Sequence, residues 1–344
     1  MGCPAAARRP PPGPGLDLHM AGHCDLRTPH CVFLDFGPGS CGMSSTNPDN
    51  TPARPEGGYA GASDEAIAFH YDVGTDFYRL WLDPRLIYSA ARWRGPLDRG
   101  PMPRVSLETA QLAKLDFHLD AVRVEECKTL LDVGCGWGAV LKRALERGVE
   151  RATGLTLSRD QAQHVRSQDW PGADVRLESY EVFTPDGPID GIISIGAFEH
   201  FVRPGYEPAH RQGIYRSFFE RCHGWLRKGG ALSLQSICWG YVDRAYAAKA
   251  VPTYVFPDSD LPWPNEVFEA ANPFFDVVYA ESRAEDYALT LRAWLKALRA
   301  QKAEIVAGHG EKIFDHYEKY LRRCTYAFEN NTVTLMRFVM SRRG

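Results

Sequence analysis

The stretch that decides the fold is Leu131-Asp-Val-Gly-Cys-Gly-Trp-Gly-Ala139. Its three glycines, Gly134, Gly136 and Gly138, allow a tight turn and let a ligand approach the backbone, because no Cβ stands in the way. A turn of this kind at the carboxyl end of a first strand is typical of nucleotide-type sites, although it also suits a plain tight connection. The spacing is G-x-G-x-G rather than G-x-G-x-x-G, and no Lys-Ser/Thr pair follows. The turn therefore predicts a ligand without phosphates.

The sequence on both sides of this turn alternates between strand and helix patterns. Five apolar runs read as strands: Thr129–Val133, Arg151–Leu155, Val175–Leu177, Gly191–Ile195 and Ala231–Ile237. Helical periodicity separates them at about 138–148, 158–167 and 208–227. A later part adds a strand at Phe275–Ala280, helices at about 284–303 and 310–328, and a last strand at Thr332–Met340. This alternation predicts the α/β class, with a doubly wound, mostly parallel sheet.

The regions outside that pattern suggest a division of the chain. Residues 1–62 contain 10 Pro and 10 Gly, a composition close to that of disordered segments, so we expect no folded core there. Translation starting at Met43 rather than Met1 is an alternative explanation of this segment. Short helices are expected over 63–127, and a substrate cap at about 239–330 within a core of 128–344.

Composition excludes several classes of protein. The 344 residues include 40 Lys and Arg against 43 Asp and Glu, and a formal charge of -3 gives no global field to attract nucleic acid. No apolar run of about 18 residues occurs and no secretory signal is recognisable, so we expect a cytoplasmic protein. The nine cysteines are odd in number and lack close pairs, which indicates free thiols and no zinc or other metal site. The sequence does not indicate the oligomeric state. The basic pair Arg8-Arg9 would attract an anionic membrane surface only weakly.

Several further motifs carry a family resemblance. They are Thr156-Leu-Ser-Arg-Asp-Gln161, Ser194-Ile-Gly-Ala-Phe-Glu-His-Phe201, His70-Tyr-Asp-Val-Gly-Thr-Asp-Phe-Tyr78, Trp81-Leu-Asp-Pro84 and Tyr88-Ser89. With the glycine turn, and in this order, they resemble the cyclopropane fatty acid synthase and mycolic acid cyclopropane synthase family of class I S-adenosylmethionine-dependent methyltransferases. The resemblance covers about 64–342. It implies a Rossmann-like sheet of seven strands with an antiparallel last strand, helices on both faces and a helical substrate cap.

The resemblance also implies a set of residues around S-adenosylmethionine. The glycines would lie under the methionine end, with Tyr88 and Ser89 closing over it, and Trp137 and Ile195 belong to the same set. Thr156, Leu157 and Gln161 would hold the ribose, where Gln161 replaces the usual acidic residue through its amide oxygen. Tyr180 would lie against the adenine, with Glu181 nearby, although Tyr180 also suits packing at the sheet edge.

Glu199 follows the fourth strand, where open α/β sheets concentrate their chemistry. Capping of the next helix is the structural alternative, and His200 is expected to be structural. In the family a bicarbonate held by a Cys amide, a Glu, a His and a Tyr acts as the base. Glu199 and Tyr287 match this set, whereas Ala90 and Gln235 stand in place of the Cys and the His. A His can carry a positive charge and a Gln cannot, so Gln235 removes a possible cationic partner and argues against the binding of bicarbonate. We therefore expect Glu199, alone or with Tyr287, to be the base.

The expected reaction is methyl transfer to an alkene carbon of a hydrophobic acceptor, such as an isoprenoid or acyl chain. The new carbocation would be stabilised by aromatic rings, and the position of the base decides the product. The altered bicarbonate ligands favour a C-methylated product over a cyclopropane. Alternatives are a cyclopropane synthase, an N- or O-methyltransferase of a small metabolite, and a cofactor-binding scaffold without catalysis. Aromatic residues suit either an acceptor channel or core packing: Tyr241, Tyr246, Tyr254, Phe256, Trp263, Phe268, Phe274 and Phe275.

Overall fold

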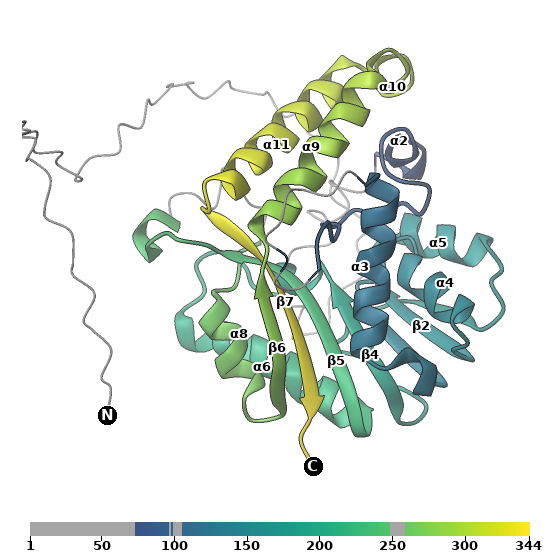
Figure 1. The fold of residues 1–344 in the computed structure, drawn as a ribbon, viewed down its shortest axis with the longest axis vertical. Coiled ribbons are helices and arrows are strands. Elements are labelled where there is room, and N and C mark those ends of the chain that lie inside the picture. The colour runs from purple at the N-terminus through teal and green to yellow at the C-terminus, as the bar shows by residue number, and fades with distance from the viewer. Residues whose placement is uncertain (1–72, 96–97, 99–104, 248–258) are drawn as a thin grey trace, which may run out of the picture. The chain divides into compact units, whose positions relative to one another are not determined.

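The alternation of strand and helix patterns becomes one sheet covered by helices (Figure 1). The structure is a computed structural model, and it describes residues 73–95, 98, 105–247 and 259–344. The expectations about residues 1–62, including the alternative start at Met43, lie outside the described residues.

Seven strands form the sheet, in the order β3-β2-β1-β4-β5-β7-β6. Their bounds are β1 Thr129–Val133, β2 Arg151–Thr156, β3 Ala173–Leu177, β4 Ile189–Ile195, β5 Leu226–Trp239, β6 Phe275–Ser282 and β7 Val333–Arg342. The pairs among β1 to β5 are parallel, and β7 runs antiparallel to both β5 and β6. The predicted sheet and its antiparallel last strand are confirmed. The order reverses between β1 and β4, so a crevice is expected at their carboxyl ends.

Helices cover both faces of the sheet. The α-helices are α2 Thr75–Arg79, α3 Leu107–Ala121, α4 Ala139–Glu146, α5 Arg159–Ser167, α6 Pro208–Trp225, α8 Pro264–Ala271, α9 Ala284–Ala300, α10 Lys302–His309 and α11 Glu311–Glu329. Short 3-10 turns are η1 Val124–Glu126 and η2 Phe198–His200. In Figure 1, α3 crosses the near face while α6 and α8 lie behind the sheet, and α9 and α11 lie side by side beyond the strand ends.

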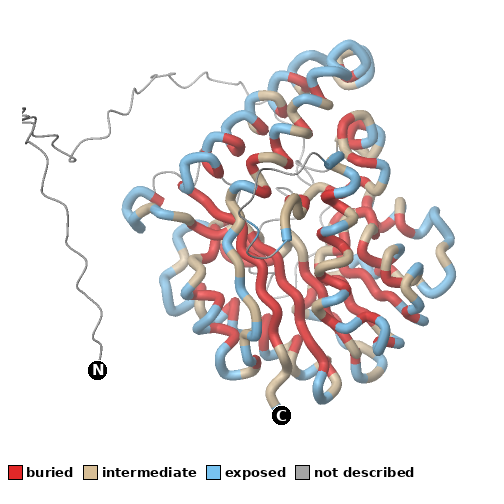
Figure 2. The backbone as a smooth tube through the Cα atoms, viewed as in Figure 1, coloured by how far each residue is buried: buried red, intermediate tan, exposed pale blue. Residues whose placement is uncertain are grey.

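Neighbouring strand residues bury their side chains in two different cores. Leu130 packs with residues of α3, α4 and α5, whereas Leu131 packs with residues of α6 and α8. Ile193 and Ile192 divide in the same way. Side chains alternate across a strand, so a continuous apolar run such as β1 fits a sheet covered on both faces. The buried strands stand out in Figure 2.

A third apolar cluster joins α2 to α9 and α11. Tyr78 on α2 and Tyr317 on α11 are hydrogen-bonded through their hydroxyl groups at 2.9 Å, and the ring of Phe77 packs on Tyr317. Elements from both ends of the described chain thus meet at the carboxyl edge of the sheet. The expected division into 63–127, a core of 128–344 and a cap at 239–330 stays a prediction.

Three further findings apply to the described residues only. Cys127, Cys135, Cys222, Cys238 and Cys324 are buried free thiols. Within these ranges no helix is long and apolar enough to cross a membrane, and no group of three His, Cys, Asp or Glu side chains suits a metal ion.

Candidate active site

The glycine turn connects β1 to α4 at the carboxyl end of the sheet. Gly134 and Gly136 have φ angles of +84° and +54°, values that L-residues rarely adopt. A Cβ on Gly134 would lie only 2.4 Å from the Cβ of Ala197, in the loop after β4. A Cβ on Gly136 would meet nothing within 4 Å. Gly134 therefore permits the close approach of two loops, and Gly136 borders open space.

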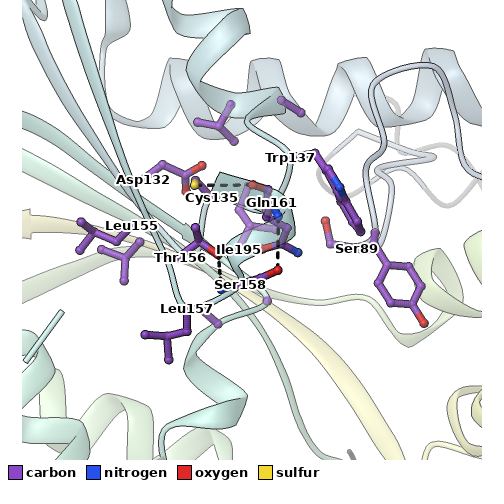
Figure 3. Close-up of a pocket in the computed structure, with 18 of the residues that line it drawn as sticks. Ser89, Asp132, Cys135, Trp137, Leu155, Thr156, Leu157, Ser158, Gln161 and Ile195 are labelled. Carbon is purple, nitrogen blue, oxygen red and sulfur yellow. Dashed lines mark hydrogen bonds between the residues drawn. The ribbon is translucent and has the colours of Figure 1, made fainter. Parts of the chain in front are cut away.

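That open space is the first cavity, and its walls come from the carboxyl ends of β1, β2 and β4. It encloses about 1210 Å³ including the part that opens to solvent, enough for a nucleoside-sized ligand. Ten of the twelve residues predicted around the cofactor line it: Tyr88, Ser89, Gly134, Gly136, Trp137, Thr156, Leu157, Gln161, Tyr180 and Ile195. Figure 3 shows Ser89 and Trp137 across the cavity from Asp132 and Leu155.

Two of the predicted residues do not line this cavity. A Cβ on Gly138 would lie 2.9 Å from Val165 and 3.0 Å from Trp170, so this glycine permits close packing of α4 against α5 and its surroundings. Glu181 is half-buried, and its backbone N–H donates to the Ser179 hydroxyl at 3.1 Å. The three glycines alternate regularly in the sequence and all have positive φ angles in the structure. The pattern therefore did not show that Gly138 has a different role from the other two.

The segment after β2 forms a small polar cluster. The Thr156 hydroxyl donates to Oε1 of Gln161 at 2.8 Å and accepts from the backbone N–H of Ser158 at 3.1 Å. The Ser158 side chain caps α5 by accepting from the N–H of Gln161 at 3.3 Å. Gln161 Oε1 is thus partly satisfied within the protein, and its Nε2 is the group with the most unused hydrogen-bonding capacity.

The loop that carries Tyr88 and Ser89 is held from two sides. The Asp83 carboxylate accepts from the backbone N–H of Ile87 at 2.9 Å, which fixes the preceding turn. From α3, Gln111 donates to the Ser89 carbonyl and Lys114 Nζ donates to the Ser89 hydroxyl, both at 2.9 Å. Ser89 therefore has a fixed position on the cavity wall.

Glu199 lies on η2, directly after β4, and only 3% of it is exposed. Its carboxylate accepts from the Ser236 hydroxyl at 3.1 Å and from the backbone N–H of Ile237 at 3.3 Å, both on β5. Burial raises the pKa of Glu199 to about 7, although these hydrogen bonds act in the opposite direction. A carboxyl group with this pKa can accept a proton near neutral pH.

Glu199 lines a second cavity that adjoins the first. The two cavities share Tyr88, Ser89, Gly196 and His200 as wall residues. A Cβ on Gly196 would lie 3.8 Å from Glu199 Oε1 and 3.9 Å from the Cβ of Ser89. The carboxylate is thus near the junction between the two cavities.

The second cavity is apolar and rich in aromatic rings. Tyr287 on α9, which the resemblance places in the site, lines it, and the centroid of its ring lies 4.4 Å from that of Phe328. Trp294 is packed on Tyr88 at 5.2 Å, also between ring centroids. Tyr320 and Cys324 on α11 complete this side. These rings can stabilise a cation that forms in the cavity.

The aromatic residues that suited either an acceptor channel or core packing lie away from the second cavity. Tyr254 and Phe256 are outside the described residues, and none of the other six lines the second cavity. Tyr241, for example, is 96% exposed, and Phe275 is buried in the core beside α6 and α8. Of the two alternatives left open by the sequence, Phe275 therefore fits core packing, and none of the six supports an acceptor channel in the second cavity, because aromatic density in sequence does not distinguish core, surface and cavity.

Gln235 is held in one orientation by Arg337, which is fully buried. A guanidinium can only donate, so Gln235 Oε1 accepts from Arg337 Nε at 2.7 Å and its Nε2 donates to the Ala90 carbonyl at 3.4 Å. Arg337 also donates to Glu281 and Asp286, at 3.1 and 2.9 Å. The charge of Arg337 is therefore compensated within the protein, and Gln235 presents a neutral amide to the second cavity.

Several wall residues were not predicted from the sequence. Lys114 and Asp132 line the first cavity, each 1% exposed, and Glu178 and Ser179 lie near Tyr180 in its wall. Lys114 lies within a helix, where no local signal distinguishes an inward lysine from a solvated one. Asp132 belongs to the quoted stretch, and its position immediately before the glycine turn is the signal that could have identified it.

Comparisons with known proteins place this chain in a family. The family model described as mycolic acid cyclopropane synthetase matches residues 61–338. Cyclopropane mycolic acid synthase 1 of Mycobacterium tuberculosis is 35% identical over 290 residues, 79% of this chain and 95% of that protein. The solved structure of the cyclopropane synthase MmaA2 from Mycobacterium tuberculosis has a TM-score of 0.70 and 32% identity, covering 82% of this chain and 99% of that one.

A second solved structure, mycolic acid cyclopropane synthase CmaA1 complexed with SAH and CTAB, also has a TM-score of 0.70. Its identity is 33%, with the same coverage of 82% and 99%. The matched region extends over the glycine turn, the two cavities, and α9 and α11.

Proposed function

Because this chain belongs to the mycolic acid cyclopropane synthetase family and is an S-adenosylmethionine-dependent methyltransferase, we propose that it methylates an alkene carbon of a hydrophobic acceptor. The cofactor occupies the first cavity and the acceptor occupies the second. When bound, S-adenosylmethionine supplies an electrophilic methyl group. The protein orients the two reactants, excludes water and accepts a proton.

One observation supports this proposal more than any other, namely the position of Glu199 between the two cavities. Its carboxylate lines the apolar cavity near Gly196 and Ser89, which also border the first cavity. Methyl transfer to an alkene leaves a carbocation, which Tyr287, Trp294 and Phe328 can stabilise through their ring faces. Glu199 then accepts the proton whose loss neutralises the product.

The residues around Glu199 do not favour bicarbonate as the base. None of the described residues that line the second cavity is Lys or Arg. Burial lowers the pKa of His200 to about 4, so this imidazole is neutral at pH 7. Gln235 supplies an amide where the resemblance implies a His, and the charge of Arg337 behind it is paired. We therefore assign the proton to Glu199 itself and expect turnover to be unchanged when bicarbonate is added to a depleted buffer.

The position of Glu199 also bears on the product. A base close to the first cavity is near the newly transferred methyl group, and loss of a proton from that methyl closes a cyclopropane ring. Loss from a neighbouring carbon would leave the C-methylated alkene that the sequence favoured. The placement of Glu199 and the names of the relatives favour ring closure, on an unsaturated acyl or isoprenoid chain.

A labelled methyl donor distinguishes these products. With S-adenosylmethionine that carries a trideuterated methyl group, a cyclopropane retains two deuterons and a C-methylated alkene retains three. We expect two deuterons, measured by mass spectrometry on products from a pool of unsaturated lipids and isoprenoids. Three deuterons on carbon would restore the C-methylation hypothesis, and three on nitrogen or oxygen would contradict alkene methylation altogether.

The pH dependence of turnover follows from the raised pKa of Glu199. Below its pKa of about 7 the carboxyl group is protonated and cannot accept a proton, so turnover falls by about tenfold for each pH unit below 7 and levels off above it. The measurement is kcat at saturating cofactor, since burial also brings the pKa values of Lys114 and Asp132 to about 7. A profile that is flat, or that rises on acidification, would contradict the role of Glu199.

A further inference from the structure

Two buried titratable side chains, Lys114 and Asp132, line the first cavity and have no part in the methyl transfer described above. Lys114 is 1% exposed and projects from α3. Its ammonium group carries three donors, and the Ser89 hydroxyl, at 2.9 Å, is its one hydrogen-bond acceptor among the described residues. A buried ammonium group that uses one donor of three retains capacity for a further acceptor in the cavity.

Asp132 lies near the end of β1, immediately before the glycine turn, and is also 1% exposed. Its Oδ1 atom is buried without a hydrogen-bond partner in the described part of the chain. A buried carboxylate oxygen in this state is unfavourable, and burial raises the pKa of Asp132 to about 7. A donor from a ligand would satisfy this oxygen and favour the ionised form. Both side chains border the same space as Ser89 and Gly134.

Few charged groups of the described residues lie near Lys114. Asp83, Asp132 and Arg337 exert electrostatic effects on it, and burial is the largest influence, lowering the pKa of Lys114 to about 7. Among the described residues that line the first cavity, Lys114 is the only Lys or Arg. His200, also in this wall, is neutral at pH 7 because burial lowers its pKa to about 4. An anionic group of a ligand in this cavity thus has one amino group available, and its negative charge would favour the protonated form of Lys114.

We propose that Lys114 binds the carboxylate of the methionine portion of the cofactor, opposite Asp132, which faces the ammonium group of the same portion. This inference rests on the proposed placement of the cofactor in the first cavity. The methionine portion is a zwitterion. Its carboxylate would favour the protonated form of Lys114 on α3, and its ammonium group would favour the ionised form of Asp132 on β1. The arrangement also fixes the direction of the cofactor, with the adenosine at the Thr156 and Tyr180 end.

A purely structural role for Lys114 makes a different prediction. Lys114 donates to Ser89 and lies near Asp83, whose carboxylate holds the turn before Tyr88. If Lys114 only supports this loop, replacing it would lower the affinity for every ligand of the cavity by a similar factor. If it binds the carboxylate, the loss depends on whether the ligand has one.

The experiment is a cycle of two ligands and two proteins, measured by isothermal titration calorimetry. The ligands are S-adenosylhomocysteine and its decarboxylated analogue, which keeps the amine and lacks the carboxylate. The proteins are the full-length wild type and Lys114→Met, which has a similar length and no charge. Lys296→Met, at an exposed position on α9, is the matched control and should bind both ligands as the wild type does.

The wild type is expected to bind S-adenosylhomocysteine about 10- to 100-fold more tightly than the decarboxylated analogue, as for a charge-assisted hydrogen bond in a buried site. In Lys114→Met that preference should fall to within about twofold, with affinity for the analogue nearly unchanged. Equal losses for both ligands would overturn the proposal in favour of a structural role.

The wild-type protein alone keeps the inference testable should Lys114→Met not fold. A wild type that binds both ligands with affinities within about twofold of each other would overturn it, since no carboxylate contact would then exist. A wild type that binds neither ligand would instead overturn the placement of the cofactor in this cavity. The two failures are therefore distinguishable.

Discussion

Replacing Glu199 by glutamine is expected to lower turnover by about 10² to 10⁴-fold. Glutamine keeps the size of the side chain. Its amide oxygen can still accept from the N–H of Ile237, and its NH2 group can donate to the Ser236 hydroxyl, the two groups that now donate to the carboxylate. It cannot accept the proton from the methylated acceptor. Affinity for S-adenosylhomocysteine should change by less than about twofold, because the carboxylate lines the second cavity and not the first.

The matched control is Glu269→Gln, an exposed position on α8, which should leave turnover within about twofold of the wild type. Steady-state turnover and calorimetric binding are the two measurements. Equal turnover in Glu199→Gln and the wild type would remove Glu199 from the reaction. A wild-type protein that binds the cofactor but methylates nothing in the substrate pool would instead indicate a scaffold without catalysis.

The second large effect is expected from Gly134→Ala. The new Cβ would lie 2.4 Å from that of Ala197, and the φ angle of +84° is strained for any L-residue. Overpacking and backbone strain each cost about 1–3 kcal/mol, so we expect the free energy of unfolding to fall by about 2–5 kcal/mol. The loop after β4 must move to relieve the contact, and binding of S-adenosylhomocysteine should weaken by at least about tenfold, as for any shift in a preorganised site.

Two other glycines provide controls for this variant. Gly136 has a φ angle of +54° but open space where a Cβ would lie, so Gly136→Ala should lower the free energy of unfolding by about 1 kcal/mol. It should still weaken the binding of S-adenosylhomocysteine, because the proposal places the ligand in that space. Gly187→Ala, with neither a positive φ nor a close neighbour, should leave both quantities unchanged. Urea unfolding gives the stabilities, and calorimetry gives the affinities. A Gly134→Ala protein as stable as Gly187→Ala would contradict the close approach of the two loops.

The sheet was predictable because its strands are buried on both faces. Continuous apolar runs such as Thr129–Val133 carry a clear signal, and β1 has the predicted bounds. The antiparallel direction of β7 came from the family resemblance and not from periodicity, since local sequence does not encode the direction in which strands pair. Strand ends were less certain: β5 begins at Leu226, five residues before the predicted run, because Arg227 to Gly230 interrupt its apolar pattern.

Much of the candidate site was predictable because its residues adjoin the strand ends. Gly134, Thr156 and Ile195 all lie near the carboxyl ends of neighbouring strands, so the topology brings them together. Gly138 shows the limit of motif reasoning, since it shares the positive φ of its neighbours while its missing Cβ faces Val165.

The second cavity was harder to predict because it depends on helix packing. Phe328 and Tyr320 reach it from α11, about 120 residues after Glu199, and no spacing rule connects them. Lys114 was also beyond sequence reasoning, because the periodicity of α3 is read from its apolar residues. In both cases the missing information is which helix face turns towards the sheet edge.

The most direct test of the central claim is a crystal structure with S-adenosylhomocysteine and an unsaturated acyl ligand bound together. The proposal predicts that the thioether sulfur lies at the junction of the two cavities beside Gly196, that the double bond lies in the second cavity, and that the Glu199 carboxylate faces it. A sulfur that points away from the second cavity, or a Glu199 side chain turned to solvent, would contradict the proposed reaction.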